Sequence, residues 1–422
     1  MSEIPESSAA PSATVLQEWR RAPMLPIAGL IGHATAVFHI NGFSPFIVPV
    51  SEEFGWSRTL TTFGLTIILL IQALGSIPIG LLVDRFASRR IGLVGMISAP
   101  LGFALIGSAS GDQTNWIVLW FIMGIVALPV QSTIWTSAIS SRFQASRGLA
   151  LGVSMCGTSL ASALFPWLGA VLIQHYGWHR AILYEALIWI VVTYPVMLLF
   201  FRGARDVART DPTDPIVAAA AAEPGMTLTQ ALRSSVYLRL LLAGAMYTFV
   251  IPPMIYNYMA IQTDGGIDTI VAAKTAAAIG FASVVGRLTT GFLIDHFNAA
   301  RVGAVAFLLP SIGCAVLLTQ GVGTGSALAA AIMLGLTMGA ELDIFGYLTT
   351  RYFGMRKIGS LFGCILLSLS LGSGLGPIVA SYNFDTHGNY SGFMMLTIIV
   401  TLLCSAIFVT LPRPGLIEQA KG

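Results

Sequence analysis

A block of sequence that occurs twice constrains the fold of this chain more than any other feature. Residues 75–90 read GSIPIGLLVDRFASRR, and residues 286–300 read GRLTTGFLIDHFNAA. Positions that agree lie 211 residues apart, and they are Gly75 and Gly286, Gly80 and Gly291, Asp84 and Asp295, and Phe86 and Phe297. Pro166 and Pro377 continue the same spacing beyond the block. A repeat of this length predicts two homologous halves.

The composition indicates that both halves lie in a membrane. Of the 422 residues 55% are hydrophobic and only 10% are charged, and the mean hydropathy is +0.80. A soluble core of this size cannot bury so much apolar surface. The four cysteines stand in apolar runs without metal-ligand spacing, so we interpret them as packing residues.

Apolar runs long enough to cross a hydrocarbon core of about 30 Å recur along the chain. They predict an all-α membrane protein with twelve transmembrane helices in two six-helix halves. The predicted spans are 26–50, 60–83, 91–109, 116–139, 149–173, 181–201, 238–261, 270–294, 302–318, 326–348, 359–380 and 392–411.

These spans divide the chain into five regions. They are a disordered tail over 1–25, an N-terminal bundle over 26–201, a linker over 202–237, a C-terminal bundle over 238–411 and a short tail over 412–422. The first apolar run lacks the flanks of a signal peptide, so we expect it to be retained.

The positions of the basic residues predict the orientation. With both termini in the cytoplasm, three of the 22 Lys and Arg residues, Arg58, Arg180 and Lys274, fall outside, Arg287 lies within a span, and the other 18 are cytoplasmic. This asymmetry obeys the positive-inside rule and agrees with an even number of spans. We therefore expect a multi-pass protein of the cell inner membrane.

Twelve spans in duplicated halves are typical of a secondary transporter. The chain has no GxxxxGK[ST] phosphate loop, no HExxH motif and no basic stripe. We expect no enzymatic activity, no cofactor or metal and no nucleic-acid partner.

Two loops carry a family resemblance. Gly80-Leu-Leu-Val-Asp84-Arg85 with Arg89 and Arg90 resembles the signature loop between helices 2 and 3 of the major facilitator superfamily, although Ala87 and Ser88 replace the usual Gly and basic residue. Arg147-Gly148-Leu-Ala-Leu-Gly152 resembles the entry of helix 5 in that family.

Shorter motifs are similar to those of the bacterial monocarboxylate and oxalate/formate transporter branch. They are Phe54-Gly55-Trp56-Ser57-Arg58, Gly177-Trp178, Gly286-Arg287 and Tyr352-Phe353-Gly354.

Asp84 stands where one predicted helix ends, so its carboxylate can accept hydrogen bonds from the N-terminus of a helix in the other half. We expect such contacts to gate the cytoplasmic side; the alternative is that the charges only stop helices and fix topology. The expected gating residues are Asp84, Arg85, Arg89, Arg142, Asp295 and Arg351.

Arg287 is the basic residue that we expect near the middle of the membrane. It precedes Asp295 by eight residues, about 12 Å along a helix, and no acid stands three or four residues from it. An intramembrane guanidinium needs an acidic partner or an external anion, and its planar fork suits a carboxylate. An ion pair with Glu341 or Asp343 is the alternative.

The resemblance implies that Arg287 binds the substrate carboxylate, because related transporters place an arginine at this position of helix 8. Two further charged positions of the animal monocarboxylate transporters are not kept. Ser283 replaces an aspartate one turn before the arginine, and a lysine of helix 1 falls near Pro49.

Glu341 and Asp343 lie two residues apart and face different directions on a helix. Asp343 shares a face with glycines, so we expect it at a helix contact, possible partners being Arg351 and Arg142. Glu341 lies on a face without glycine and is the favoured proton carrier, with Asp343 and His39 as further candidates and a structural ion pair as the alternative.

Tyr256 and Asn257 follow Pro252 and Pro253, which predict a broken helix 7 with exposed hydrogen-bonding groups. Both are candidates for substrate contact. Tyr258 fits an aromatic belt at the interface equally well.

We therefore predict a transporter that moves a small organic monocarboxylate by alternating access, favouring proton symport over anion exchange. The expected partners are the organic anion, protons and membrane lipid, and we expect a monomer. Export of an amphipathic metabolite or drug, or ligand sensing without transport, are the other hypotheses.

Overall fold

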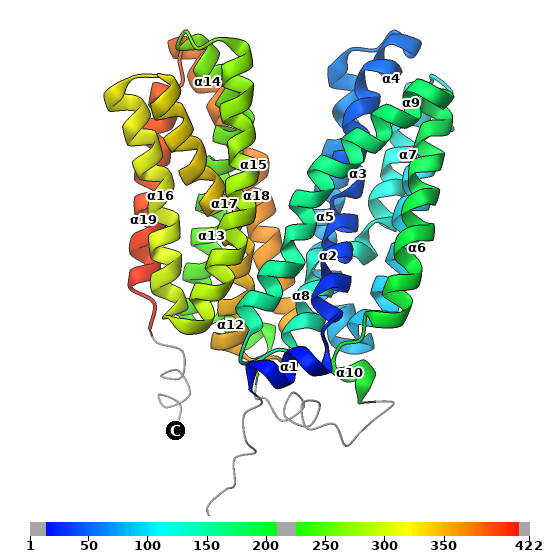
Figure 1. Cartoon of the computed structure of the whole chain (residues 1–422), viewed down its shortest axis with the longest axis vertical. Coiled ribbons are helices and arrows are strands. Elements are labelled where there is room, and N and C mark those ends of the chain that lie inside the picture. The colour runs from blue at the N-terminus through cyan, green and yellow to red at the C-terminus, as the bar shows by residue number, and fades with distance from the viewer. Residues whose placement is uncertain (1–13, 209–224, 413–422) are drawn as a thin grey trace, which may run out of the picture.

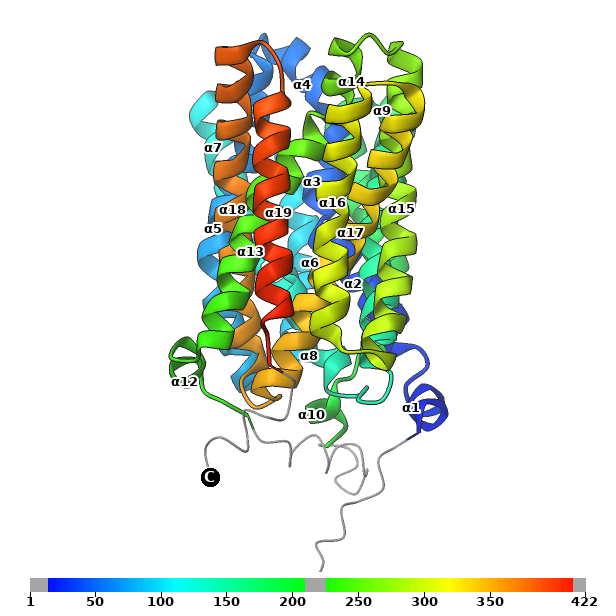
Figure 2. The same cartoon turned by 90° about the vertical axis from the view of Figure 1, so that its left-hand side faces the viewer.

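The computed structural model describes residues 14–208 and 225–412. Within these residues the structure is helical, apart from an isolated bridge between Gly225 and Gly354. Figure 1 shows two helix bundles that touch at one end and spread apart at the other. We call these the closed end and the open end; the short helices α1, α10 and α12 lie at the closed end. Figure 2, turned by 90°, shows the second bundle in front.

The first bundle contains six spans, two of them broken. Its elements are α2 (Leu25–Ala36), α3 (Phe38–Phe43), η1 (Ser44–Phe46), α4 (Ile47–Phe54), α5 (Arg58–Phe86), α6 (Ser88–Ile106), α7 (Gln113–Val126), η2 (Leu128–Val130), α8 (Ser132–Ser140) and α9 (Arg147–Phe200). The pieces from α2 to α4 follow one another where the sequence predicts the first span. α7 with η2 and α8 form a second broken span that bends by 44°. α9 contains two spans, because Gly177 with φ 71° interrupts it.

The second bundle repeats this plan with fewer breaks. Its spans are α13 (Ser235–Tyr256), α15 (Thr269–His296), α16 (Ala299–Gln320), α17 (Thr324–Phe353), α18 (Ile358–His387) and α19 (Ser391–Val409). α14 (Tyr258–Asp264) continues α13 beyond a break at Asn257. The linker contributes α10 (Ala204–Val207) and α12 (Leu228–Leu232). Two halves of six helices confirm the predicted fold class.

Each half has its own hydrophobic core. In the first half Phe38 packs edge-on against Phe103 and Phe165, with ring centroids 4.9 and 4.7 Å apart. In the second half Phe307 contacts Tyr247 and Phe408. Large side chains such as Leu74, 75% exposed, stay outside both cores, which is the arrangement that lipid contact requires.

Two carboxylates join the halves at the closed end. Asp84 stands two residues before the end of α5. It accepts hydrogen bonds from the backbone N–H groups of Gly359 and Ser360 at the start of α18, at 2.8 and 3.0 Å. Asp295 near the end of α15 accepts from Gly148 and Leu149 at the start of α9, at 2.7 and 2.8 Å. Each acid thus caps a helix of the opposite half.

Glycines let these helices approach. A Cβ atom on Gly80 would collide with the carbonyl oxygen of Gly359, and one on Gly359 would collide with that of Gly80. Gly148 and Gly291 show the same reciprocal approach between α9 and α15. The contact at Asp84 and the contact at Asp295 are therefore two copies of one motif, and Gly80 and Gly291 are the repeated residues that they share.

The N-terminal segment differs from the expected disordered tail. Residues 1–13 lie outside the described residues, but α1 (Val15–Arg21) is helical and Glu18 within it is buried. Its carboxylate binds backbone N–H groups of residues 144–146. A polar tail is ordered here because its acid finds donors in a distant loop. Most of the linker, residues 209–224, also lies outside the described residues.

Ala87 between α5 and α6 is strained. It has φ 70° and ψ 147°. Every other described residue with a positive φ is a glycine. The family resemblance places a glycine at this position. A residue with a Cβ atom in this region of the map costs on the order of 1–3 kcal/mol.

We expect Ala87→Gly to raise the free energy of unfolding by about 1 kcal/mol, because the relieved strain exceeds the added entropy of the unfolded chain. The midpoint of thermal unfolding of the purified protein in detergent measures this. Gly80→Ala is the control with the opposite sign, since its Cβ would meet the backbone of α18. An unchanged or lower midpoint for Ala87→Gly would contradict the prediction.

Candidate functional site

Arg287 lies in α15, where this helix packs against α9 of the other half and α17 of its own half. Towards the closed end α15 packs on α9, where a Cβ on Gly152 would lie 2.8 Å from the Arg287 carbonyl oxygen. On the other side a Cβ on Gly339 of α17 would lie 2.8 Å from the Arg287 nitrogen. One turn towards the open end the hydroxyls of Ser283 and Ser159 meet at 3.4 Å. Glycines on both neighbours thus fix the backbone that carries the arginine.

The Arg287 side chain is buried without full hydrogen bonding. It is 4% exposed, and neither its Nε nor its Nη1 atom has a hydrogen-bond partner among the described residues. Leaving a buried charged donor unpaired is costly, typically several kcal/mol. A guanidinium in this state has N–H groups that can donate hydrogen bonds to an incoming acceptor.

Two acids of α17 share the electrostatic field of Arg287 without pairing with it. Glu341 is half-buried and Asp343 is fully buried, and both interact electrostatically with the guanidinium. The ion pairs and hydrogen bonds found in the described residues join Arg287 to neither of them. Both Asp343 oxygens lack a hydrogen-bond partner within the same residues. The expected pairing of Asp343 with Arg351 or Arg142 is not seen among these bonds.

The neighbours of the two acids distinguish their surroundings. Gly335 and Gly339 on the α17 face near Asp343 lie against the α15 backbone at Ile279 and Ser283. On the face of Glu341, the Thr337 hydroxyl donates to Ala306 at 2.8 Å, while Met338 is 39% exposed. Glu341 is therefore at the edge of the bundle core, where solvent reaches it, and Asp343 is inside a helix contact.

The first half contributes a histidine to this region. His33 of α2 is buried, its Nδ1 lies 2.8 Å from the Ser154 hydroxyl and 3.0 Å from the Gly29 oxygen, and its Nε2 has no partner among the described residues. It also interacts electrostatically with Arg287. His39 instead meets Gln72 of α5, at 3.2 Å between the Nε2 atoms, so the structure connects it to the core of the first half.

Tyr256 and Asn257 separate at the break between α13 and α14. Tyr256 is 72% exposed and interacts electrostatically with Glu341. Asn257 donates to the Pro253 oxygen and accepts from the Tyr390 hydroxyl, both at 2.9 Å. Tyr258 is buried and donates to the Ala327 oxygen, which differs from the interfacial position considered for it. Tyr256 is thus the more accessible side chain of the three.

Sequence reasoning missed Glu185. This residue of α9 lies within a predicted span, is fully buried, and has no hydrogen-bond partner for either oxygen among the described residues. Gly42 and Gly169 lie beside its carboxylate. A count of every acid inside the spans would have found it, because the span 181–201 already included it.

The expected gating arginines have separate contacts at the closed end. Arg89 donates to the Phe201 oxygen at 2.7 Å, at the end of α9, and Arg85 lies 5.2 Å over the Phe86 ring. Arg351 donates to the Tyr347 hydroxyl at 3.2 Å, and Arg142 is buried. Arg147 crosses between the halves and donates to the Thr350 hydroxyl at 2.9 Å.

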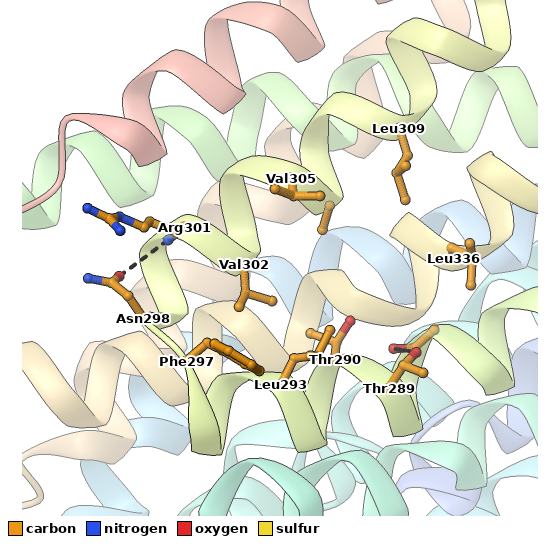
Figure 3. A pocket seen from close by; sticks show the side chains of 12 residues that line it. Thr289, Thr290, Leu293, Phe297, Asn298, Arg301, Val302, Val305, Leu309 and Leu336 are labelled. Atoms are coloured by element: carbon orange, nitrogen blue, oxygen red, sulfur yellow. Dashed lines mark hydrogen bonds between the residues drawn. The ribbon is translucent and has the colours of Figure 1, made fainter.

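A separate apolar groove of about 520 Å³ lies between α15, α16 and α17. Figure 3 shows Leu293, Val302 and Leu336 on its walls and Asn298 capping α16 at its mouth. Arg287, Glu341 and Asp343 do not line it. The described residues contain no group of three or more His, Cys, Asp or Glu side chains that could hold a metal ion.

Known proteins resemble this chain in sequence over most of its length. The chain is 26% identical over 380 residues to monocarboxylate transporter 13 of Bos taurus, covering 89% of this chain and 85% of that protein. It is 27% identical to human monocarboxylate transporter 11, over 90% and 82%. It is 24% identical to a gallate transporter of Pseudomonas putida, over 78% and 82%.

Solved structures agree on the fold. The Escherichia coli fucose:proton symporter superposes with a TM-score of 0.69 at 16% identity, covering 92% of this chain and 98% of that one. The human organic anion transporter MFSD10 gives 0.70 at 17% identity, over 92% and 99%.

The family model described as Major Facilitator Superfamily matches residues 29–363. That range includes both interlocked carboxylate motifs at the closed end and the unpaired Arg287 between them. Transport across a membrane, and not catalysis, is the activity of such folds. The chain belongs to the Major Facilitator Superfamily of membrane transporters.

Proposed function

We propose that this transporter moves a small organic monocarboxylate across the cell inner membrane. The observation that carries the proposal is Arg287, a guanidinium 4% exposed whose Nε and Nη1 atoms lack hydrogen-bond partners among the described residues. A carboxylate of the substrate would supply both the missing charge and the missing acceptors. Relatives named as monocarboxylate and gallate transporters support this class.

The number of charges favours one carboxylate over two. Of the 22 Lys and Arg residues, the sequence places one, Arg287, inside a predicted span. Glu341 and Asp343, which interact with it, are acidic. A second substrate carboxylate would be buried near these acids without a cation of its own, which is strongly unfavourable. An aliphatic or aromatic body suits the exposed side chains of Met338, one turn before Glu341, and of Tyr256, which interacts with Glu341.

Alternating access follows from the two ends of the molecule. The closed end contains the basic loops, so by the positive-inside rule we place it in the cytoplasm with both termini. The structure then corresponds to a state open to the outside. Release into the cell requires the contacts of Asp84 and Asp295 with the opposite half to break, and the bundles to rock about the level of Arg287.

Proton symport is the coupling that we favour. Glu341 is within the field of Arg287 and reachable from solvent, so a substrate anion on the guanidinium would change how readily the acid keeps its proton. Anion exchange is the rival, because Arg287 alone could bind one anion for each anion released. The unpaired acids Asp343 and Glu185 are the next candidates for a proton.

Arg287→Ala should abolish carboxylate transport, and Arg287→Lys should be impaired roughly 10- to 100-fold. Lysine keeps the charge and loses the planar fork, and a hydrogen bond to a charged group contributes about 1.5–3 kcal/mol. Uptake of labelled monocarboxylates into proteoliposomes measures both variants.

Neutral amide analogues of the transported acid serve as the control for Arg287. They should compete poorly against the acid in the wild-type protein. Competition equal to that of the acid, or normal transport by the alanine variant, would mean that Arg287 is structural and would remove the main support for a monocarboxylate.

Glu341→Gln should retain substrate counterflow and lose accumulation driven by a pH gradient, because an amide cannot release a proton. Both activities are measured in the same vesicles. Full accumulation by this variant would exclude Glu341 as the carrier, and Asp343→Asn, His39→Gln and Glu185→Gln would then be compared.

Asp84→Asn should slow transport several-fold while substrate affinity changes by no more than a few fold. The amide places an N–H₂ donor against the N–H groups of Gly359 and Ser360, so the closed end holds less firmly, far from Arg287. Transport rates and equilibrium binding are compared, with Asp295→Asn as the matched variant. Loss of binding in folded protein would reject a gating role.

A further inference from the structure

The N-terminal helix α1 is tied to the loop that connects α8 and α9. Glu18 is 2% exposed. Its Oε1 accepts from the N–H groups of Gln144 and Ala145 at 2.8 and 2.9 Å, and its Oε2 accepts from the N–H and hydroxyl of Ser146 at 3.1 and 3.0 Å. Four donors on one carboxylate make a specific, charge-assisted attachment.

The next side chain strengthens this attachment. The Trp19 indole donates to the Ser146 hydroxyl at 3.0 Å, and its ring packs edge-on against Phe143 with centroids 5.3 Å apart. Ser146 therefore receives a hydrogen bond from Trp19 while giving one to Glu18. Glu18 and Trp19 thus both bind Ser146, the residue that precedes α9.

The same loop forms half of the contact between the bundles. Glu18 holds the N–H groups of residues 144–146, and Asp295 of the other half holds those of Gly148 and Leu149. Two carboxylates thus bind five N–H groups within six residues. Glu18 belongs to the same half as the loop, so its bonds can persist when the Asp295 bonds break.

We propose that Glu18 is a positioning residue for the closed end. It fixes the loop so that the N–H groups of Gly148 and Leu149 already point at the place of the Asp295 carboxylate, and it thereby stabilises the state that is closed on this side. The proposal rests on the alternating access described above, but it does not depend on which substrate is transported.

The equivalent contact of Asp84 has a different support. The linker supplies it: the Arg205 guanidinium donates to the backbone oxygen of Asp84 at 2.5 Å. Near Gly359 and Ser360 the Met226 N–H donates to the Phe353 oxygen at 2.8 Å, and Gly225 bridges to Gly354. Among the described residues, the carboxylate of Glu18 accepts its hydrogen bonds from the α8–α9 loop. Loss of Glu18 should therefore weaken the Asp295 contact and spare the Asp84 contact.

A double-mutant cycle on the substrate-free, full-length protein tests this. Spin labels replace the exposed Arg90 and Arg301, one on each half at the closed end, in a chain without its native cysteines, and their distance distribution gives the ratio of open to closed molecules at that end. Glu18→Gln should raise this ratio roughly 5- to 10-fold, the effect expected from the loss of about one net hydrogen bond, because the amide keeps one acceptor oxygen.

The two gate acids provide the matched backgrounds. In Asp295→Asn the further change Glu18→Gln should alter the ratio less than about 2-fold, whereas in Asp84→Asn it should keep its full effect. Glu52→Gln, an exposed acid at the open end, should leave the ratio unchanged.

An equal effect of Glu18→Gln in both backgrounds would overturn the proposal, because it would show general destabilisation in place of a specific link to Asp295. An unchanged ratio in the otherwise wild-type chain would overturn it as well. Neither result depends on carboxylate transport, so a failure here is distinguishable from a failure of the proposed substrate.

Discussion

Two aspartates that cap helices of the opposite half hold this molecule in one state. Each bundle has a separate core, so the halves are joined where Asp84 meets Gly359 and Ser360 and where Asp295 meets Gly148 and Leu149. A helix N-terminus carries partial positive charge and free N–H groups, which makes it a receptor for a carboxylate that needs no dedicated side chain. Such a bond is strong enough to order an interface and can be exchanged for water when the interface opens. That balance suits a contact that forms and breaks in every cycle of the alternating access proposed above.

In the middle of the described part of the molecule, by contrast, buried charged groups are not paired with hydrogen-bond partners. Arg287 is buried between helices that approach closely at Gly152 and Gly339, yet the acids in its field do not close on it. At the closed end every carboxylate described here is satisfied by backbone donors, while at the level of Arg287 buried charges are left unpaired. Hydrogen bonds to charged groups therefore stabilise the closed end, whereas among the described residues the charged groups around Arg287 lack such bonds. This leaves the guanidinium available for an anion.

Glu18 extends the set of carboxylates that organise the closed end. Asp84 and Asp295 link the halves to each other, whereas Glu18 links the N-terminal segment to a loop of its own half. The three acids use one kind of interaction, a carboxylate on consecutive backbone N–H groups, both between the halves and within one half. In the positioning role proposed for Glu18, its bonds limit how far the α8–α9 loop relaxes when the Asp295 bonds break.

The sequence by itself determined the twelve spans, the two halves and the equivalence of Asp84 with Asp295, because hydropathy and internal repetition are properties of the residues in order along the chain. It also predicted Arg287, Glu341 and Asp343 as charges inside the membrane. Only the tertiary structure decided that Arg287 is not paired with those acids, that Asn257 is tied to Tyr390, that Glu185 is buried without a partner and that Glu18 is ordered. The partners of Glu18 and Asp84 are backbone N–H groups far away in the chain. Since nearly every residue carries such a group, no residue type marks the partner, and only the packing of the helices selects it.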